Sequence, residues 1–176
     1  GSLGWTSNDP DEPSGEVRLE GAQESLGSTH EDFTLQAFRW PEPAAELITL
    51  SEHRGSVVLL SYFATFCPLC NLEVPDLEAS LAAPFAGEDL EIWLVNSGST
   101  QAEAWDFAES YGIGLPMLMD TDMSLYMSYS RAEASLEEYA PFPVHVLLDR
   151  NGVIRYLNFK TDAEELRSTI EMLLAE

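Results

Sequence analysis

Two cysteines, Cys67 and Cys70, stand close together in the segment SYFATFCPLCNLEVP and are the only cysteines of the chain. An apolar, strand-like segment precedes them and a helix-forming segment follows, so Cys67 opens the predicted helix. Unpaired N–H groups and the helix dipole favour a thiolate at such a position, and the thiol pKa in such motifs falls to roughly 3.5–7.5. Cys70 lies on nearly the same helix face, where its thiol can attack a mixed disulfide on Cys67.

Three chemistries are open to this pair: dithiol–disulfide exchange, metal binding and a structural disulfide. A bond between residues so near in sequence would restrain the unfolded chain very little, which disfavours a structural role. Zinc would need four ligands, whereas His30, His53 and His145 are scattered along the sequence. A copper(I) site built from both cysteines and His145 is the remaining metal alternative. We therefore expect exchange chemistry, without a metal or any other cofactor.

The composition limits the class of protein and of partner. The chain has 176 residues, 45% of them hydrophobic, which suits one domain with a sizeable core. Its 31 acidic and 8 basic residues give a formal net charge of −23, which would repel nucleic acid and anionic membrane surfaces. A solvated acidic surface explains this charge, and an acidic face for a basic partner is the alternative.

The sequence divides into a tail and one folded domain. Residues 1–30 are acidic, punctuated by Gly, Ser and Pro, and poor in apolar periodicity, which predicts a disordered linker or tail. The folded domain is predicted at residues 31–176. The uncharged run at residues 55–72 contains Pro68 and Asn71 and fits a buried strand running into a helix better than a membrane span. The chain begins without methionine, so we expect that a signal peptide or membrane anchor has been removed.

Apolar patterning predicts an α/β domain. We expect strands at residues 32–38, 57–63, 90–96, around 116–120, 143–149 and 153–159, the last two as a hairpin. Helices are expected from Cys67 to about Ala83, at residues 101–112, and after a capping box formed by Thr161 and Glu164. A short helical turn at 50–56 and an irregular region at 124–140 complete the pattern. This order implies a mixed central sheet with helices on both faces.

Three segments, DFTL, LSEHRGSVVLLSYFATFCPLCNLEVP and FPVHVLLDRNGVIRY, resemble the TlpA/ResA-like thiol–disulfide oxidoreductases of the thioredoxin superfamily, with an AhpC/TSA-redoxin-like pattern. The resemblance runs from about residue 32 to the end of the chain. It implies a thioredoxin-like fold with an N-terminal strand extension. It also implies that Cys67 and Cys70 are catalytic, that Glu73 is an acid or base beside them, and that Pro143 is a cis-proline that helps to hold the substrate backbone.

The sequence departs from this family at three positions near the cysteines. Phe66 stands where tryptophan is usual, Leu69 where proline is common, and Phe142 where a smaller residue precedes the cis-proline. Phe66 and Phe142 either form an apolar rim for a protein substrate or belong to the core. His145 is expected to make a satisfied buried hydrogen bond. The tyrosines of the irregular region are expected to pack rather than to react, namely Tyr126, Tyr129 and Tyr139.

The expected function is that of an enzyme, a thiol–disulfide oxidoreductase acting on protein disulfides outside the cytoplasm, either periplasmic or membrane-anchored. Neither residue between the cysteines is histidine, which favours a reductase. The expected partners are a protein thiol or disulfide substrate and an upstream electron-donor protein, and we expect a monomer. A thiol peroxidase is one alternative, although Ala64 occupies the position where that class needs threonine and Thr65 is one place off. A copper-handling or docking module on the same fold is the other.

Overall fold

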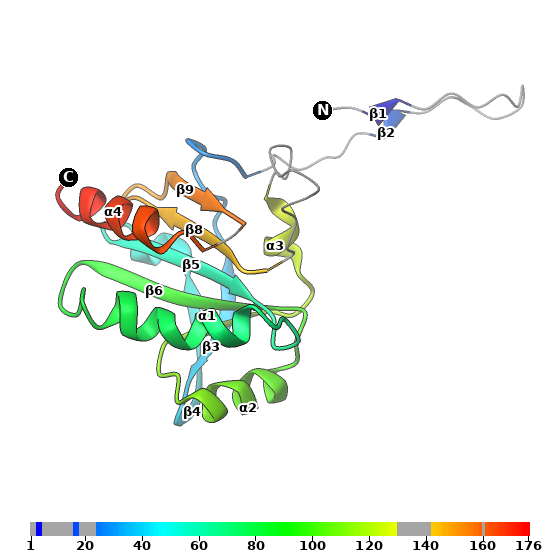
Figure 1. Ribbon diagram of the computed structural model, residues 1–176. Coiled ribbons are helices and arrows are strands. Elements are labelled where there is room, and N and C mark those ends of the chain that lie inside the picture. The colour runs from blue at the N-terminus through cyan, green and yellow to red at the C-terminus, as the bar shows by residue number, and fades with distance from the viewer. Residues whose placement is uncertain (1–2, 5–15, 18–23, 130–141, 160) are drawn as a thin grey trace, which may run out of the picture.

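The computed structural model describes residues 3–4, 16–17, 24–129, 142–159 and 161–176. A mixed sheet of seven strands forms its centre, in the spatial order β4-β3-β7-β6-β5-β8-β9 (Figure 1). These strands are β3 (Thr34–Arg39), β4 (Glu42–Thr49), β5 (Val57–Phe63), β6 (Leu90–Ser97), β7 (Met117–Asp120), β8 (Val144–Leu148) and β9 (Ile154–Asn158). Two short strands, β1 (Leu3–Gly4) and β2 (Glu16–Val17), pair with each other outside this sheet.

The three central strands, β5, β6 and β7, run parallel, and the outer pairs are antiparallel. All seven side chains of β5 are buried, as a strand covered on both faces requires. The continuous apolar run Val57–Phe63 therefore forms a central strand, as its pattern predicts.

Helices cover both faces of the sheet. They are η1 (Leu50–His53), α1 (Cys70–Leu77), η2 (Glu78–Ala82), α2 (Gln101–Tyr111), α3 (Ser124–Ser128) and α4 (Ala163–Leu174). On one face, α1, η2 and α4 pack against the odd-numbered β5 residues Val57 and Leu59. On the other face, α2 and α3 pack against Val58, Leu60 and Tyr62. The expected mixed sheet with helices on both faces is confirmed.

The helix that follows the cysteines begins later than the sequence predicts. Cys67 lies in a turn before α1, where the N–H of Asn71 donates to its carbonyl oxygen at 3.3 Å, and α1 itself starts at Cys70. The helix continues through Pro75 and then widens to π-type bonding, with the N–H of Ala83 donating to the carbonyl of Glu78 at 3.0 Å. The kink expected at Pro75 stays a prediction.

The N-terminal cap of α4 is not the one that the sequence indicates. Asp162 is the cap residue, and its carboxylate accepts from the N–H of Glu165 at 3.0 Å. The expected capping box of Thr161 and Glu164 is therefore wrong. The physical reason is a tertiary contact, because the Thr161 hydroxyl donates to the carboxylate of Glu73 instead.

The segment ahead of β3 packs against the domain. Glu24 bridges to Tyr129 and Thr29 bridges to Val153, while the side chain of His30 is buried. The packed part of the chain thus reaches into the region that the sequence assigns to the linker. Buried polar side chains attach this segment to the domain. It lacks the apolar periodicity that usually marks a packed element. Within the described ranges, no helix is both long and apolar enough to cross a membrane.

Candidate active site around a buried disulfide

Cys67 and Cys70 form a disulfide at the carboxyl end of β5, with their Cα atoms 5.3 Å apart. The side chain of Cys67 is 7% exposed, whereas Cys70 is 0% exposed. The N–H of Cys70, at the start of α1, donates to Sγ of Cys67 at 3.2 Å. A thiolate at Cys67 would therefore receive a hydrogen bond at a helix start, which favours the charged sulfur. Cys67 is the sulfur on the solvent side of the pair.

The other wall of the site is the loop that leads into β8. The Phe142–Pro143 peptide bond is cis, as the sequence predicts. The carbonyl oxygen of Phe142 lies 3.6 Å from Sγ of Cys67. Pro143 is itself buried, so the peptide at the entrance of β8 lies directly against the disulfide.

The structure separates the two phenylalanines that the sequence groups together. Phe142 is buried and packs on Tyr126, with ring centroids 4.4 Å apart. Phe66 is 64% exposed, and its ring lies 6.3 Å from that of Phe142. Leu69 and Leu72, in the same turn and helix as the cysteines, are exposed as well. Phe66, Leu69 and Leu72 form an apolar rim, and Phe142 belongs to the core behind it.

A chain of hydrogen bonds runs from Glu73 into the sheet. The Thr161 hydroxyl donates to Oε2 of Glu73, and Oγ1 of Thr161 lies 2.8 Å from Nε2 of His145. Nδ1 of His145 lies 3.2 Å from Oγ of Ser61. An ionised carboxylate only accepts, so Thr161 donates to Glu73 and accepts from Nε2–H of His145. The ring then accepts from the Ser61 hydroxyl at Nδ1, and every donor in the chain points toward Glu73.

His145 is neutral in this chain. Burial lowers its pKa from 6.5 to about 4, because a charged imidazole would lose its hydration inside the sheet. Both ring nitrogens have hydrogen-bond partners, so the expected satisfied buried histidine is confirmed.

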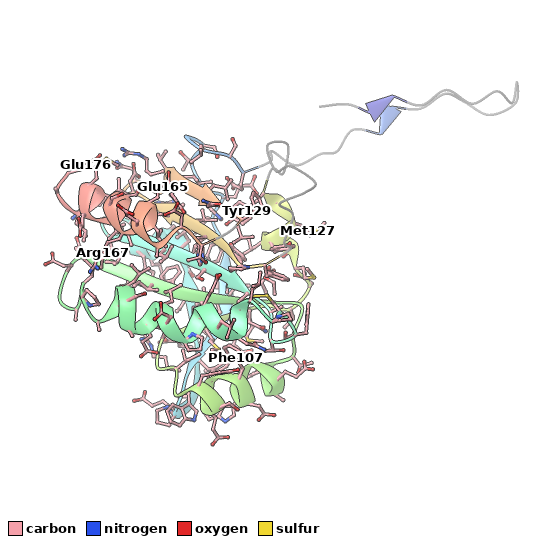
Figure 2. All side chains as sticks on the ribbon, in the orientation of Figure 1. Phe107, Met127, Tyr129, Glu165, Arg167 and Glu176 are labelled. Atoms are coloured by element: carbon pink, nitrogen blue, oxygen red, sulfur yellow. A yellow bond between two sulfur atoms is a disulfide. The ribbon has the colours of Figure 1, made fainter. Side chains whose placement is uncertain are left out.

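A second buried polar cluster lies at the N-terminal segment. Nδ1 of His30 lies 2.7 Å from the carbonyl oxygen of Glu31, so Nδ1 carries the proton and Nε2 accepts. Tyr129 lies just after α3 (Figure 2), and its hydroxyl donates to Nε2 at 2.6 Å and accepts from the hydroxyl of Tyr62 at 2.7 Å. Burial raises the pKa of both tyrosines, so they stay protonated. Tyr126 and Tyr129 pack as expected, and Tyr139 lies outside the described residues.

The residues considered for a peroxide or metal site make their hydrogen bonds away from the cysteines. Thr65 donates both its N–H and its hydroxyl to Oγ of Ser99, at 3.1 and 3.0 Å. The ring nitrogens of His145 bond to Ser61 and Thr161 rather than to sulfur. Among the residues that the structure describes, no group of three or more His, Cys, Asp and Glu side chains could hold a metal ion.

The sequence profile of the AhpC/TSA family matches residues 26–157, which is most of the chain. The chain belongs to the AhpC/TSA family. It is 28% identical over 141 residues to the thiol-disulfide oxidoreductase ResA of Geobacillus kaustophilus, covering 80% of this chain and 73% of that protein. Its homologues thus include thiol–disulfide oxidoreductases, and the resemblance stated from the sequence is confirmed.

Two solved structures illustrate the fold that this AhpC/TSA chain shares. The thioredoxin domain of a thiol-disulfide oxidoreductase from Bacteroides vulgatus superposes with a TM-score of 0.64 at 19% identity, covering 85% of this chain and 98% of that one. A reduced 2-Cys peroxiredoxin from Plasmodium vivax superposes with a TM-score of 0.68 at 18% identity, covering 85% and 96%. Since both kinds of protein have this fold, the likeness confirms a thioredoxin-like fold and does not choose between the two chemistries.

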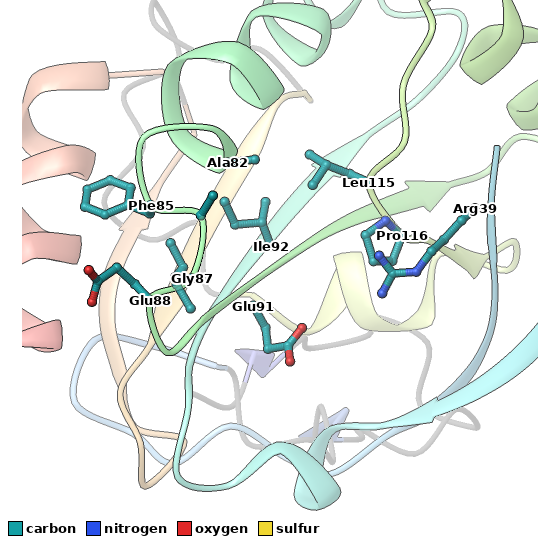
Figure 3. Close-up of a pocket in the computed structure, with 11 residues that line it drawn as sticks. Arg39, Ala82, Phe85, Gly87, Glu88, Glu91, Ile92, Leu115 and Pro116 are labelled. Carbon is teal, nitrogen blue, oxygen red and sulfur yellow. The ribbon is translucent and has the colours of Figure 1, made fainter. Parts of the chain in front are cut away.

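A surface pocket of this AhpC/TSA chain lies away from the disulfide. Its volume is about 170 Å³, and its lining includes Phe85, Glu91, Leu115 and Arg39 (Figure 3). It adjoins the first residues of β6, which pair with the first residues of the parallel strand β5. The cysteines follow the opposite end of β5, so this pocket is separate from the disulfide site.

Sequence reasoning missed two members of the hydrogen-bond chain that leads to Glu73, namely Ser61 and Thr161. A signal for Ser61 exists, because it is a polar residue in the otherwise apolar run VVLLSYF, just as His145 is in VHVLL. The antiparallel pairing of β5 with β8 sets these two residues opposite each other. Thr161 carries no such signal, since its local pattern also fits a helix cap.

Proposed function

We propose that this chain is a thiol–disulfide oxidoreductase that reduces disulfides in protein substrates, with Cys67 as the attacking thiolate and Cys70 as the resolving thiol. One observation carries the assignment of roles: Cys67 is the more accessible sulfur, 7% exposed, and receives an N–H hydrogen bond, while Cys70 is 0% exposed. An incoming disulfide can reach the first sulfur before the second. Membership of the AhpC/TSA family and the ResA relatives support the reaction class.

The proposed reaction begins from the reduced pair. The Cys67 thiolate attacks a substrate disulfide, so a bond forms between its Sγ and one substrate sulfur, and the other substrate sulfur leaves as a thiolate. Cys70 then loses its proton and attacks Sγ of Cys67, which releases the second substrate thiolate and leaves the Cys67–Cys70 disulfide. The substrate gains two electrons and takes up two protons. An upstream dithiol protein restores the reduced pair.

Glu73 is proposed to accept the proton of Cys70 when that thiol attacks. The two residues are three positions apart in α1, so their side chains lie on adjacent parts of one helix surface. A buried thiol needs a base to become a nucleophile, because burial disfavours the thiolate. Glu73 can then pass this proton to the departing substrate thiolate.

The substrate is proposed to be an extended protein segment that lies along the peptide before Pro143 and against the apolar rim. The position of the Phe142 carbonyl beside Cys67 supports this placement. The exposed side chains of Phe66, Leu69 and Leu72 offer apolar contact to such a segment. By the resemblance to TlpA/ResA-like proteins, we propose a monomer that works outside the cytoplasm and is tethered through a segment preceding the chain.

The test is a comparison of Cys70→Ser with Cys67→Ser. We expect Cys70→Ser to accumulate mixed disulfides with insulin, used as a protein disulfide probe, that disappear on reduction, because the adduct on Cys67 cannot be resolved. Cys67→Ser should trap far less. Equal trapping by both variants would contradict the assigned roles. The reduction potential of the pair, measured against a glutathione buffer, decides whether the protein donates or accepts electrons.

A further inference from the structure

We infer that Thr161 and His145 are positioning residues for Glu73, which they hold through a hydrogen-bonded chain anchored in the central sheet. The inference rests on the proposed function, in which the Glu73 carboxylate accepts the proton of Cys70. The chain joins α1, the residue before α4, and strands β8 and β5. Segments that are distant in sequence are thus linked to one carboxylate through Thr161.

The donor-to-acceptor direction of these hydrogen bonds suits a proton acceptor at Glu73. Thr161 donates to Oε2, which fixes the side chain of Glu73 in one orientation. A carboxylate has two oxygens with about four lone-pair sites, so the group can still take a proton. The Thr161 hydroxyl is itself oriented because it accepts from Nε2–H of His145. Bonds linked in this way polarise one another and hold a fixed direction.

The anchor of the chain is rigid. Ser61 and His145 are a paired position of β5 and β8, and both side chains are buried. Strand β8 starts at the cis peptide that contacts Cys67 and reaches His145 two residues after Pro143. The same strand therefore sets the position of the peptide beside the attacking sulfur and of the chain to Glu73.

The contribution of His145 is a hydrogen bond and not a charge. Titratable and charged groups on the elements around Glu73 include Cys70 and Asp76 in α1, His145 in β8, Arg155 and Tyr156 in β9, and Glu164 and Glu165 in α4 after its cap residue Asp162. A neutral imidazole donates at one nitrogen and accepts at the other, which links Thr161 to Ser61. A protonated ring would donate at both nitrogens and could not accept from Ser61.

The test removes the Thr161 hydroxyl. In Thr161→Val the carboxylate of Glu73 loses the donor that orients it, so proton transfer from Cys70, and with it resolution, slows. We expect the pH profile for single-turnover insulin reduction to change from that of the wild type, with resolution slowed by up to about tenfold, the effect of one hydrogen bond to a charged group. Thr161→Ser, which keeps the hydroxyl, should restore the wild-type profile.

Matched variants separate this effect from a general loss of structure. Thr169→Val deletes a hydroxyl that donates within α4, to the carbonyl of Glu165 at 2.8 Å, and should leave the profile unmoved. In a Glu73→Gln background, Thr161→Val should produce no further shift. Circular dichroism and thermal unfolding check that each variant is folded.

The outcomes distinguish this inference from the proposed function. If Glu73→Gln changes the profile and folded Thr161→Val does not, the positioning role is overturned and the proposed function stands. If Thr161→Val shifts the profile equally with and without Glu73, the effect does not pass through that carboxylate and the inference is also overturned. If the reduced wild-type protein does not reduce insulin and Cys70→Ser traps none, the proposed function itself fails.

Discussion

His145 and His30 are both buried imidazoles, and their surroundings differ. His145 lies in the middle of the sheet among neutral hydroxyl groups, and its lowered pKa is caused by burial alone. Burial lowers the pKa of His30 too, but the Glu31 carbonyl and the Glu24 carboxylate, whose Oε1 lies 3.9 Å from Nδ1, oppose the shift. One histidine is kept neutral by its surroundings, whereas the other lies beside a group that would stabilise its charge.

This difference in surroundings matches the groups that each histidine connects. The hydrogen-bond chain through His145 ends at Glu73, one helical turn from Cys70. The cluster of His30 ends at Glu24 and ties the N-terminal segment to Tyr129 after α3. We therefore expect substitutions at the first to change chemistry and stability together, and those at the second to change stability alone.

The largest expected effect that separates the two is on acid stability. Between pH 6.5 and about 4, the unfolded chain binds a proton at His145 that the folded chain does not, so stability falls as the pH drops through this window. The loss amounts to about 3 kcal/mol at the lower end. His145→Gln should remove this part of the pH dependence, and His30→Gln should remove less. Urea unfolding at several pH values measures it, and equal flattening by both variants would contradict the comparison.

A pair of hydroxyl deletions gives the next largest effect. Tyr129→Phe removes the group between the Tyr62 hydroxyl and Nε2 of His30, which leaves two buried polar atoms without a partner. We expect a loss of about 2 kcal/mol in the free energy of unfolding. The pH profile of insulin reduction should stay at that of the wild type, in contrast to Thr161→Val. A shifted profile in Tyr129→Phe would mean that the two clusters are coupled.

The smallest expected effect concerns Glu24. Its Oε1 accepts from the N–H of Glu31 at 2.7 Å and its Oε2 accepts from the Ser28 hydroxyl at 3.2 Å. Glu24→Gln keeps one acceptor oxygen, loses the other and removes the charge that strengthens both hydrogen bonds, so we expect a loss of about 1 kcal/mol near neutral pH. Chemical denaturation measures it, with Glu52→Gln, an exposed residue of η1, as the control. A loss no larger than that of the control would show that the Glu24 charge contributes nothing.

Strands β5, β7 and β8 have every side chain buried, and the sequence predicts all three. An apolar run such as Val57–Phe63 is buried on both faces only inside the sheet, so its pattern predicts a central strand. Strand β4 was not predicted, and the reason is physical. It pairs only with β3 at the edge of the sheet, and most of its side chains, including Leu47 at 72%, are exposed. Backbone hydrogen bonds define such a strand, and no apolar period marks it.

In the candidate site, too, the features set by local sequence were predicted and those set by tertiary contacts were not. The cysteine pair and the burial of His145 follow from short sequence patterns, and the cis peptide at Pro143 follows from the family resemblance. The cap of α4 was not predicted, because Thr161 and Asp162 both precede a glutamate by three residues and local chemistry accepts either one. Contacts with Glu73 and His145, from remote parts of the chain, decide which residue caps the helix. The proposed roles of Glu73 and Pro143 stay predictions.

The double use of the Thr161 hydroxyl limits which mutations this position can tolerate. The group donates to Glu73 and accepts from His145 at once, so a side chain that can only donate or only accept leaves one partly buried neighbour unpaired. Lysine cannot accept, an ionised aspartate cannot donate, and valine can do neither. Among side chains of similar size, serine donates and accepts at a single hydroxyl oxygen as threonine does, so it is the substitution that this position should tolerate best.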